Sequence, residues 1–252
     1  MVRTENDMSK QVTILQWNVW YLEDIKNITA FLKENKADII CLQELTIGFD
    51  KQNHIHTPEY IAKELGYNVH YQDIAFAGKK MKLANAIFSK YKLSDTRTAW
   101  INQEQGTGSY DDENRAYVEA MVTVDNKELT IGTVHMSYTH AFEPSERKLQ
   151  ETNALVDAIK DNNKNFVLAG DFNAQPNSEV IKKIEKHVNN LGPNYDQKTW
   201  TTKPFSYNGF ETNTLDWRLD YVFGSDDTTV RSTDVLKTEF SDHLPVIVEV
   251  EL

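Results

Sequence analysis

FVLAGDFNAQP, residues 166–176, joins an apolar run to a carboxylate and an amide. The short apolar run predicts a buried strand over 165–169. Asp171 follows this strand, Asn173 comes two residues later, and Pro176 ends the segment. Taken alone, the segment is also typical of an Asx turn before a helix. The choice between a turn and a functional site depends on what the chain places at the ends of its other strands.

Apolar periodicity predicts many strands and a few amphipathic helices. Helices are expected at 22–34, 57–65, 144–160 and 178–187, with Leu149, Val156 and Ile159 as the apolar face of the third. Strands are expected at 12–17, 37–42, 68–76, 83–89, 93–100, 116–124, 129–135, 165–169, 219–223, 229–236 and 245–250. Hairpin-linked strands combined with amphipathic helices indicate packed layers. We therefore expect an α/β fold, a four-layered α/β sandwich of two packed mixed β-sheets flanked by helices.

The composition limits the classes of partner. The chain has 252 residues, with 27 Lys and Arg against 38 Asp and Glu, and a net charge of −11. Because we find no repeat, low-complexity tract or linker, a single domain over 1–252 is expected, with residues 1–10 disordered. An acidic chain argues against tight, non-specific coating of nucleic acid. Acidity does not exclude a phosphate substrate, because a bound cation can invert the local field.

The single cysteine and the N-terminus bear on the compartment. Cys41 alone cannot form an internal disulfide or a thiolate metal site, and we expect it to be a small buried hydrophobe. The first residues lack the apolar core of a signal peptide, and no run approaches membrane-spanning length. These features favour a cytoplasmic protein without membrane insertion, and we expect a monomer.

Polar residues stand at the ends of several predicted strands. An unpaired carboxylate or imidazole is costly to bury, so strand-borne polar groups tend to lie at a rim where loops and water meet. Each has another interpretation, such as a turn residue for Asn18, a loop charge for Glu44 or a hydrogen-bonded strand-end residue for His135. These interpretations do not predict the joint order of the set, which is Asn18, Glu44, His135, Asp171, Asn173, Asp220, Asp242 and His243.

Six short segments, in this order, resemble the motifs of the endonuclease/exonuclease/phosphatase superfamily. That superfamily includes deoxyribonuclease-like and exonuclease III-like metal-dependent phosphoester hydrolases. The similarity runs from about Thr13 to the C-terminus, and the fold of the superfamily is also a four-layered α/β sandwich. The segments are QWNV (16–19), DIICLQE (38–44), TVH (133–135), GDFN (170–173), WRLDYV (217–222) and SDHLP (241–245).

The resemblance implies a Mg²⁺ site, in which Mn²⁺ could substitute. Glu44 would be the principal ligand, with Asn18 beside it and Asp242 contributing. Mg²⁺ prefers oxygen ligands and keeps several waters, so that one or two carboxylates suffice.

The resemblance also implies catalytic and phosphate-binding roles. Asp171 would orient and deprotonate the attacking water, and Asn173 would hydrogen-bond the phosphate and the transition state. His243 would bind a non-bridging oxygen or act as acid or base, with Asp220 holding its tautomer. Which of Asp171 and His243 is the general base stays open. Two further residues, His135 and Arg115, would contact the phosphate.

The implied activity is Mg²⁺-dependent phosphoester hydrolysis, as a phosphodiesterase or phosphatase, by metal-assisted in-line attack of water on phosphorus. The acidic charge and the lack of a basic stripe favour a small or single-stranded substrate. Alternatives are a DNA endonuclease or exonuclease acting on duplex DNA, and a non-catalytic binding module. Aromatic residues within 190–217 either stack a base or sugar or pack as core. The segment 101–114 is either an inert loop or a substrate lid.

Overall fold

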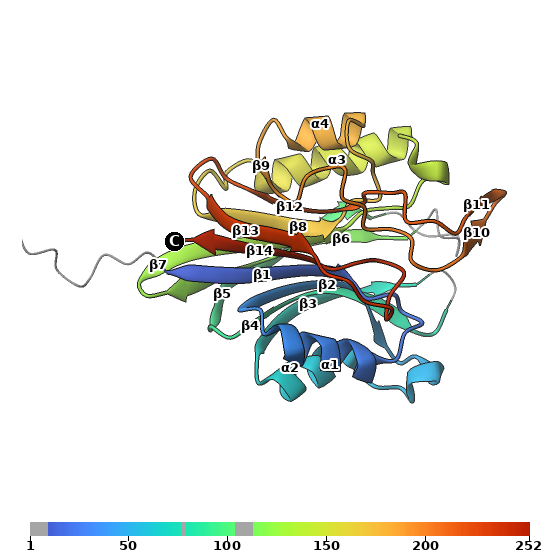
Figure 1. Ribbon diagram of the computed structural model, residues 1–252, viewed down its shortest axis with the longest axis horizontal. Helices are drawn as coiled ribbons and strands as arrows, with labels where there is room; N and C mark the ends of the chain where they lie inside the picture. Colours follow the sequence, from blue (N-terminus) through green and yellow to red (C-terminus); the bar gives the residue numbers. More distant parts are fainter. Residues whose placement is uncertain (1–9, 77–78, 104–112) are drawn as a thin grey trace, which may run out of the picture.

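Two six-stranded sheets pack face to face with helices on both outer sides (Figure 1). The computed structural model describes residues 10–76, 79–103 and 113–252. Residues 1–9 and most of the 101–114 segment lie outside this description, and with them the predictions made for those stretches.

The first sheet carries two helices on its outer face. Its strands, in spatial order, are β13 (Thr229–Val235), β14 (Val246–Glu251), β1 (Gln11–Asn18), β2 (Ile39–Ile47), β4 (Lys82–Ser89) and β3 (Asn68–Ala75). The outer helices are α1 (Ile25–Asn35) and α2 (Thr57–Leu65). A 3₁₀ turn, η1 (Asp50–Gln52), precedes α2.

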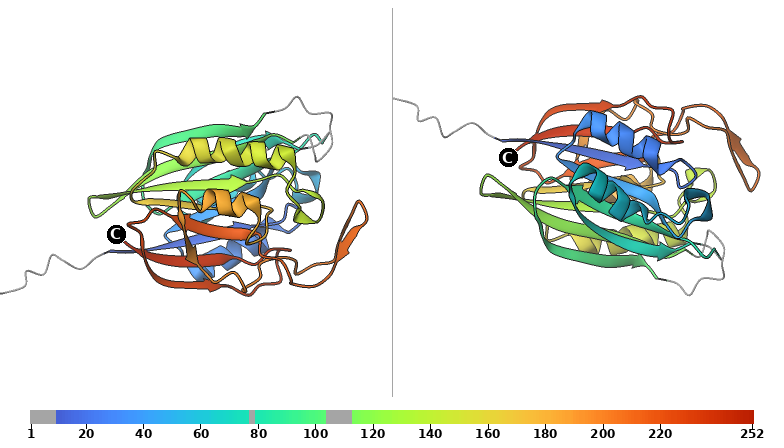
Figure 2. Two further views of the ribbon diagram at one scale, coloured as in Figure 1. Left: turned by 90° about the horizontal axis from the view of Figure 1, so that it is seen from above. Right: turned by 90° about the horizontal axis from the view of Figure 1, so that it is seen from below.

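The second sheet is covered by the other pair of helices. Its strands, in spatial order, are β5 (Leu93–Asn102), β6 (Arg115–Val124), β7 (Lys127–His135), β8 (Phe166–Asp171), β12 (Asp220–Gly224) and β9 (Asn189–Gly192). The outer helices are α3 (Glu146–Ile159) and α4 (Glu179–Ile184), and a 3₁₀ turn, η3 (His140–Phe142), precedes α3. The hairpin of β10 (Phe205–Tyr207) and β11 (Phe210–Thr212) pairs only with itself and extends from the body (Figure 2).

The alternation of side chains along the central strands builds the layers. On β8, Val167 and Ala169 join the apolar cluster between the sheets, whereas Phe166 and Leu168 face the helices. Because both faces of β8 are buried, residues 166–169 form a continuous apolar run in the sequence. Cys41 lies in the cluster between the sheets, fully buried, and burial raises the pKa of its thiol to about 12. Its expected role as a small hydrophobe is confirmed.

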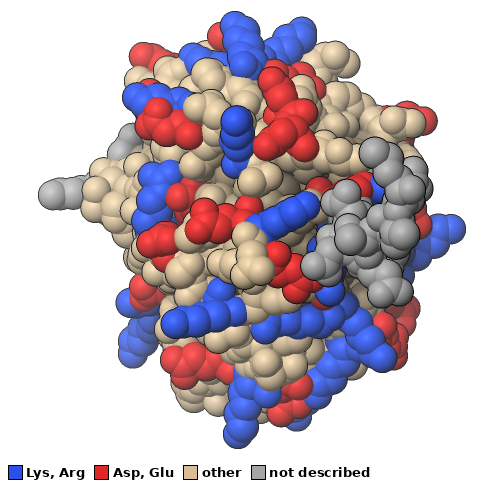
Figure 3. Space-filling model, turned by 90° about the vertical axis from the view of Figure 1, so that its left-hand side faces the viewer, with Lys and Arg blue, Asp and Glu red and all other residues tan. Residues whose placement is uncertain are grey.

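Strand direction brings polar residues to one rim. The parallel pairs in the described sheets are β1–β2 and β7–β8. Because Asn18 at the end of β1 contacts Asp171 at the end of β8, the carboxyl ends of these four strands lie at the same end of the sandwich. His135 is in register with Asp171, and Asp171 is in register with Asp220 at the start of antiparallel β12. The opposite end of the molecule carries Lys and Arg side chains interspersed with Asp and Glu (Figure 3).

The predicted four-layered sandwich is confirmed, and all predicted strands and helices are present; α2 has the predicted bounds, and the other elements have shifted ends. The first helix begins at Ile25 because the side chain of Asp24 caps it by accepting from the Lys26 N–H. The buried face of α3 is also different, since Lys148 and Glu151 lie inside it. Strands β9, β10 and β11 were not expected, because three or four residues are too few to show a period.

Candidate active site

Glu44 enters the site from a bulge in β2. The register of β2 against β4 shifts between Leu42 and Leu45, and Glu44 has a φ of 60°, which is uncommon outside glycine. Its Oε1 accepts from Asn18 Nδ2 at 3.1 Å, and its Oε2 accepts from the Tyr21 N–H at 3.1 Å. The surrounding sheet holds this uncommon conformation, and the carboxylate lines a cavity.

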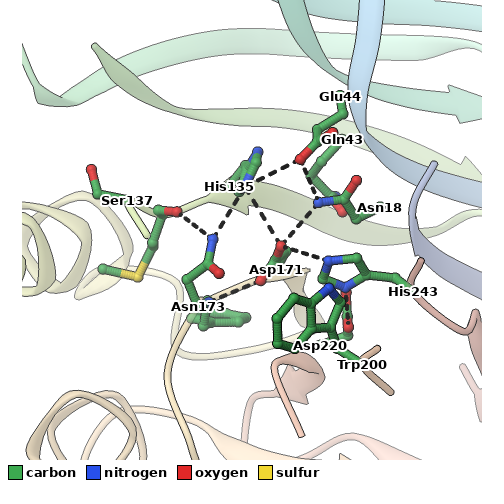
Figure 4. Close-up of polar contacts among 12 residues, drawn as sticks. Asn18, Gln43, Glu44, His135, Ser137, Asp171, Asn173, Trp200, Asp220 and His243 are labelled. Atoms are coloured by element: carbon green, nitrogen blue, oxygen red, sulfur yellow. Dashed lines mark hydrogen bonds and ion pairs between the residues drawn. The ribbon is translucent and has the colours of Figure 1, made fainter. Parts of the chain in front are cut away.

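Asp171 lies at the centre of the polar residues (Figure 4). Its Oδ2 accepts from Asn18 Nδ2 at 3.0 Å, and its Oδ1 accepts from the Asn173 N–H at 2.9 Å. The Nε2 atoms of His135 and His243 lie 3.5 and 3.6 Å from Oδ2. One carboxylate therefore connects residues from β1, β7, β8 and the loop before β14.

His243 is held by a buried carboxylate. Its Nδ1 lies 2.8 Å from Asp220 Oδ2, and Asp220 is fully buried. The His243 N–H donates to Ser241 Oγ at 3.0 Å, and that hydroxyl donates to the Asn18 carbonyl at 2.7 Å. Because Asp220 accepts at Nδ1, the ring is fixed with Nε2 facing Asp171.

The two imidazoles have opposite pKa shifts. Burial lowers the pKa of His135 well below its ordinary value, and the positive charges of Arg115 and His243 lower it further. Burial also opposes the charged form of His243, but Asp220, Asp171 and Asp242 outweigh it and raise that pKa well above its ordinary value. These shifts favour the neutral form of His135 and the protonated form of His243.

The carboxylates at the cavity hold an excess of negative charge. Burial raises the pKa of Asp171 and of Asp242 to about 6, and the charge of Glu44 contributes to the second shift. Burial raises the pKa of Glu44 as well. Such a set of desolvated oxygen donors favours a bound cation, which would relieve their repulsion.

The structure brings all the residues expected at the site to one place. Those that line the cavity of about 390 Å³ are Glu44, Arg115, His135, Asp171, Asn173, Asp242 and His243. We call six of these residues the polar floor: Glu44, His135, Asp171, Asn173, Asp242 and His243. Asn18 and Asp220 lie behind it and hold Glu44, Asp171 and His243 by the hydrogen bonds described above. Asn85, for which no role was assigned, donates to the Ala116 carbonyl at 3.1 Å.

Arg115 does not point a free charge at the cavity. Its guanidinium lies 2.8 Å from Glu113 Oε2, and its Nε donates to Ser137 Oγ at 3.3 Å. Both members of the ion pair are buried and both line the cavity. Glu113 therefore offsets part of the positive charge that a phosphate would meet there.

Two groups of side chains could hold a metal ion. Asp171, Asp220 and His243 bring ligand atoms within 4.8 Å of one another. In that group, His243 Nδ1 and Asp220 Oδ2 are already hydrogen-bonded to each other at 2.8 Å. Glu44 and Asp242 also border the cavity, and carboxylate oxygens suit a hard cation.

Lys148 is a functional candidate that sequence reasoning missed. Its side chain is 1 % exposed, and its Nζ donates to the Ser137 carbonyl at 2.5 Å and the Phe172 carbonyl at 2.6 Å. It thereby joins the loop after His135 to the loop that carries Asn173. The one signal was a lysine beside the expected apolar face of the helix, which is ordinarily a solvent-exposed residue.

A pair of buried glutamines beneath the floor was also missed. Gln16 Nε2 donates to Gln43 Oε1 at 2.5 Å, and Gln43 Nε2 donates to Thr133 Oγ1 at 2.9 Å. These bonds tie β1 and β2 of one sheet to β7 of the other. Polar residues inside apolar strands were the available signal, since a fully buried amide needs a partner.

The comparisons with known proteins agree on one family. The model of the endonuclease/exonuclease/phosphatase family matches residues 15–243. An exodeoxyribonuclease from Bacillus subtilis is 25% identical, covering 92% of this chain and 97% of the relative. A family protein from Leptotrichia buccalis has a TM-score of 0.74 at 19% identity, covering 96% of this chain and 100% of the other. A mannosyl-6-phosphatase from Bacteroides thetaiotaomicron has a TM-score of 0.69 at 17% identity, with 95% and 99% coverage.

Proposed function

Because the chain belongs to the endonuclease/exonuclease/phosphatase family, whose members hydrolyse phosphoester bonds, we propose that it is a Mg²⁺-dependent phosphoester hydrolase with Asp171 as the general base. The observation that carries this proposal is the position of Asp171 between the imidazoles of His135 and His243, whose Nε2 atoms lie 3.5 and 3.6 Å from its Oδ2, on the same cavity as Glu44.

The donor set supports a hard divalent cation. Glu44 would be its principal ligand, with Asp242 and the amide of Asn18 contributing, and Mn²⁺ could substitute for Mg²⁺. When bound, the cation supplies positive charge that offsets the charge of the phosphate and of the leaving oxygen.

The side chains of the site have separate roles in proton transfer and phosphate binding. Asp171, with a pKa of about 6, suits a base that accepts a proton from water near neutral pH. His243, charged and held by Asp220, suits a donor to a non-bridging oxygen rather than a base. Neutral His135 and the amide of Asn173, which lie 3.2 Å apart, would position the phosphate, and Arg115 would add charge from the side.

The charge of the chain supports a small or single-stranded substrate. A net charge of −11 disfavours tracking along a duplex. In the described residues, no helix has the length and apolarity needed to cross a membrane. We further propose that the chain acts as a single-domain cytoplasmic monomer. Duplex DNA cleavage is the second candidate, favoured by the resemblance to the exodeoxyribonuclease.

A substrate panel tests this proposal. Purified protein with Mg²⁺ or Mn²⁺ is assayed on phosphomonoesters, phosphodiesters, single-stranded oligonucleotides, supercoiled plasmid and linear duplex DNA. We expect turnover of a small or single-stranded ester that is lost in Glu44→Gln and on chelation. Nicking of plasmid that Glu44→Gln abolishes would favour the duplex nuclease instead. A folded protein that hydrolyses no member of the panel would overturn the proposal and leave a non-catalytic binding module.

A further inference from the structure

Two small aromatic clusters border the cavity from opposite sheets. They are separate from the three apolar clusters that hold the layers together. The first flank, from the end of the first sheet, contributes Trp20, Tyr21, Phe76 and Leu83 to the cavity. The second flank contributes Tyr138, Phe142, Trp200, Phe205 and Tyr207.

Two residues of the second flank, Phe205 and Tyr207, come from a hairpin that belongs to neither six-stranded sheet. The β10–β11 hairpin pairs only with itself, and a lone two-stranded hairpin is marginally stable in water. Its rings pack instead on the body: Phe205 lies 5.0 Å from Trp200, and both Phe205 and Tyr207 lie 5.8 Å from Tyr138, between ring centroids. Phe205 and Tyr207 alternate with Ser206 and are only partly buried. Packing on the body thus holds the rings of Phe205 and Tyr207 at the cavity.

The size and chemistry of the cavity indicate what enters it. A volume of about 390 Å³ is at the small end of ligand sites. A planar ring presents two faces and can contact aromatic side chains on both, which polar sugars and inorganic phosphate cannot do equally well. A base inside a duplex is already stacked and has no free face for such contacts. The flanks therefore favour a free or unstacked ring.

We propose that the cavity binds a phosphate ester whose alcohol carries a planar ring, as a nucleotide does, with the ring between the two aromatic flanks and the phosphate on the polar floor. This inference rests on the proposed function for the place of the phosphate. Phe205 and Tyr207 are the specificity-determining residues, because they reach the cavity from an element that contributes nothing to the floor.

Binding of a matched pair of ligands tests the inference without turnover. The probes are the non-hydrolysable 5′-phosphonate analogues of adenosine monophosphate and of ribose 5-phosphate, in which a hydroxyl on the anomeric carbon takes the place of the base. Calorimetry with wild-type protein in Mg²⁺ should give about tenfold tighter binding of the adenosine analogue. Equal affinities, or no binding of either analogue, would overturn the inference. Hydrolysis of the substrate panel is a separate measurement, so failure of the proposed function is recognised independently.

Variants of the hairpin locate the ring. Tyr207→Ala and Phe205→Ala should each weaken the adenosine analogue by about five- to tenfold and leave the ribose analogue unchanged. Thr212→Ala is the matched control, because Thr212 pairs with Phe205 in register but does not line the cavity. An equal loss for both analogues, or no loss for either, would contradict this placement of the ring.

Discussion

The polar floor and the second flank border the same cavity but are held in different ways. Most floor residues stand at or beside the ends of strands, and Glu44 stands at the bulge in β2; register and hydrogen bonds to buried side chains fix them. The second flank is held by ring packing, and two of its five residues, Phe205 and Tyr207, come from the β10–β11 hairpin. The core that fixes the chemistry is thus separate from the hairpin that contacts the rest of the substrate, so specificity can vary without disturbing the floor.

The largest effect should follow from removing the base in the floor. Asp171→Asn keeps the shape of the side chain but cannot take a proton, and its single amide oxygen can accept from only one of the two donors, Asn18 and Asn173. We expect kcat to fall about 10³-fold with little change in KM, because general base catalysis contributes on this scale. Steady-state kinetics on the best panel substrate, with circular dichroism as a folding control, measures it. A kcat within tenfold of wild type would mean that the floor acts by another base.

A smaller loss is expected when the support behind the floor is removed. Lys148→Met leaves the Ser137 and Phe172 carbonyls without their buried donor, at a cost of about 2 kcal/mol in the free energy of unfolding. Because these carbonyls belong to the loops beside His135 and Asn173, kcat should fall about tenfold while KM changes little. Urea denaturation and kinetics measure the two effects.

Lys148→Arg is the matched variant for this prediction. The guanidinium keeps the charge and could reach the same carbonyls, so it should restore part of kcat. Lys160→Met, near the exposed end of α3, is the control for lysine loss and should leave both quantities unchanged. A loss of stability in Lys148→Met with unaltered kcat would show that Lys148 supports the fold and does not position the floor.

Cation binding should depend on pH, because it requires the carboxyl groups of the polar floor to be ionised. The second flank contains no carboxyl group and should not affect this dependence. The pKa of Asp171 and of Asp242 is about 6 in the fold, against an ordinary value of 3.8. Each such carboxyl stabilises the metal-free fold fully below pH 3.8, and that contribution is lost as pH rises through 6. A cation replaces the protons, so its apparent affinity should fall about tenfold per pH unit below 6 for each carboxyl that must ionise.

Thermal unfolding with and without Mg²⁺ checks this expectation. The increase in Tm caused by Mg²⁺ should be larger at pH 7 than at pH 5, and smaller in Glu44→Gln at both. Tyr207→Ala, which leaves the floor intact, should show the wild-type increase. An increase that is equal at the two pH values would mean that these carboxyls do not meet the cation.

Much of the fold and the grouping of polar residues could be predicted because strand ends are readable. Apolar runs such as 166–169 mark strands, and a polar residue at the end of each run lies at a rim by geometry. Lys148 could not be predicted, since a buried lysine needs partners that only the tertiary structure supplies. The β10–β11 hairpin could not be predicted from the sequence either. Its strands have three residues each, and its rings fit either a core or a ligand surface.

The smallest effect should come from behind the second flank. Phe210 packs on Phe142 and Trp217, at 6.0 and 5.5 Å between ring centroids, and does not line the cavity. Phe210→Leu keeps an apolar side chain there but loosens the hairpin that carries Phe205 and Tyr207. We expect KM to rise two- to threefold with kcat unchanged, since about 0.5 kcal/mol of ring packing is lost. A fall in kcat instead would show that the hairpin and the floor are mechanically coupled, and the separation of chemistry from specificity would then not hold.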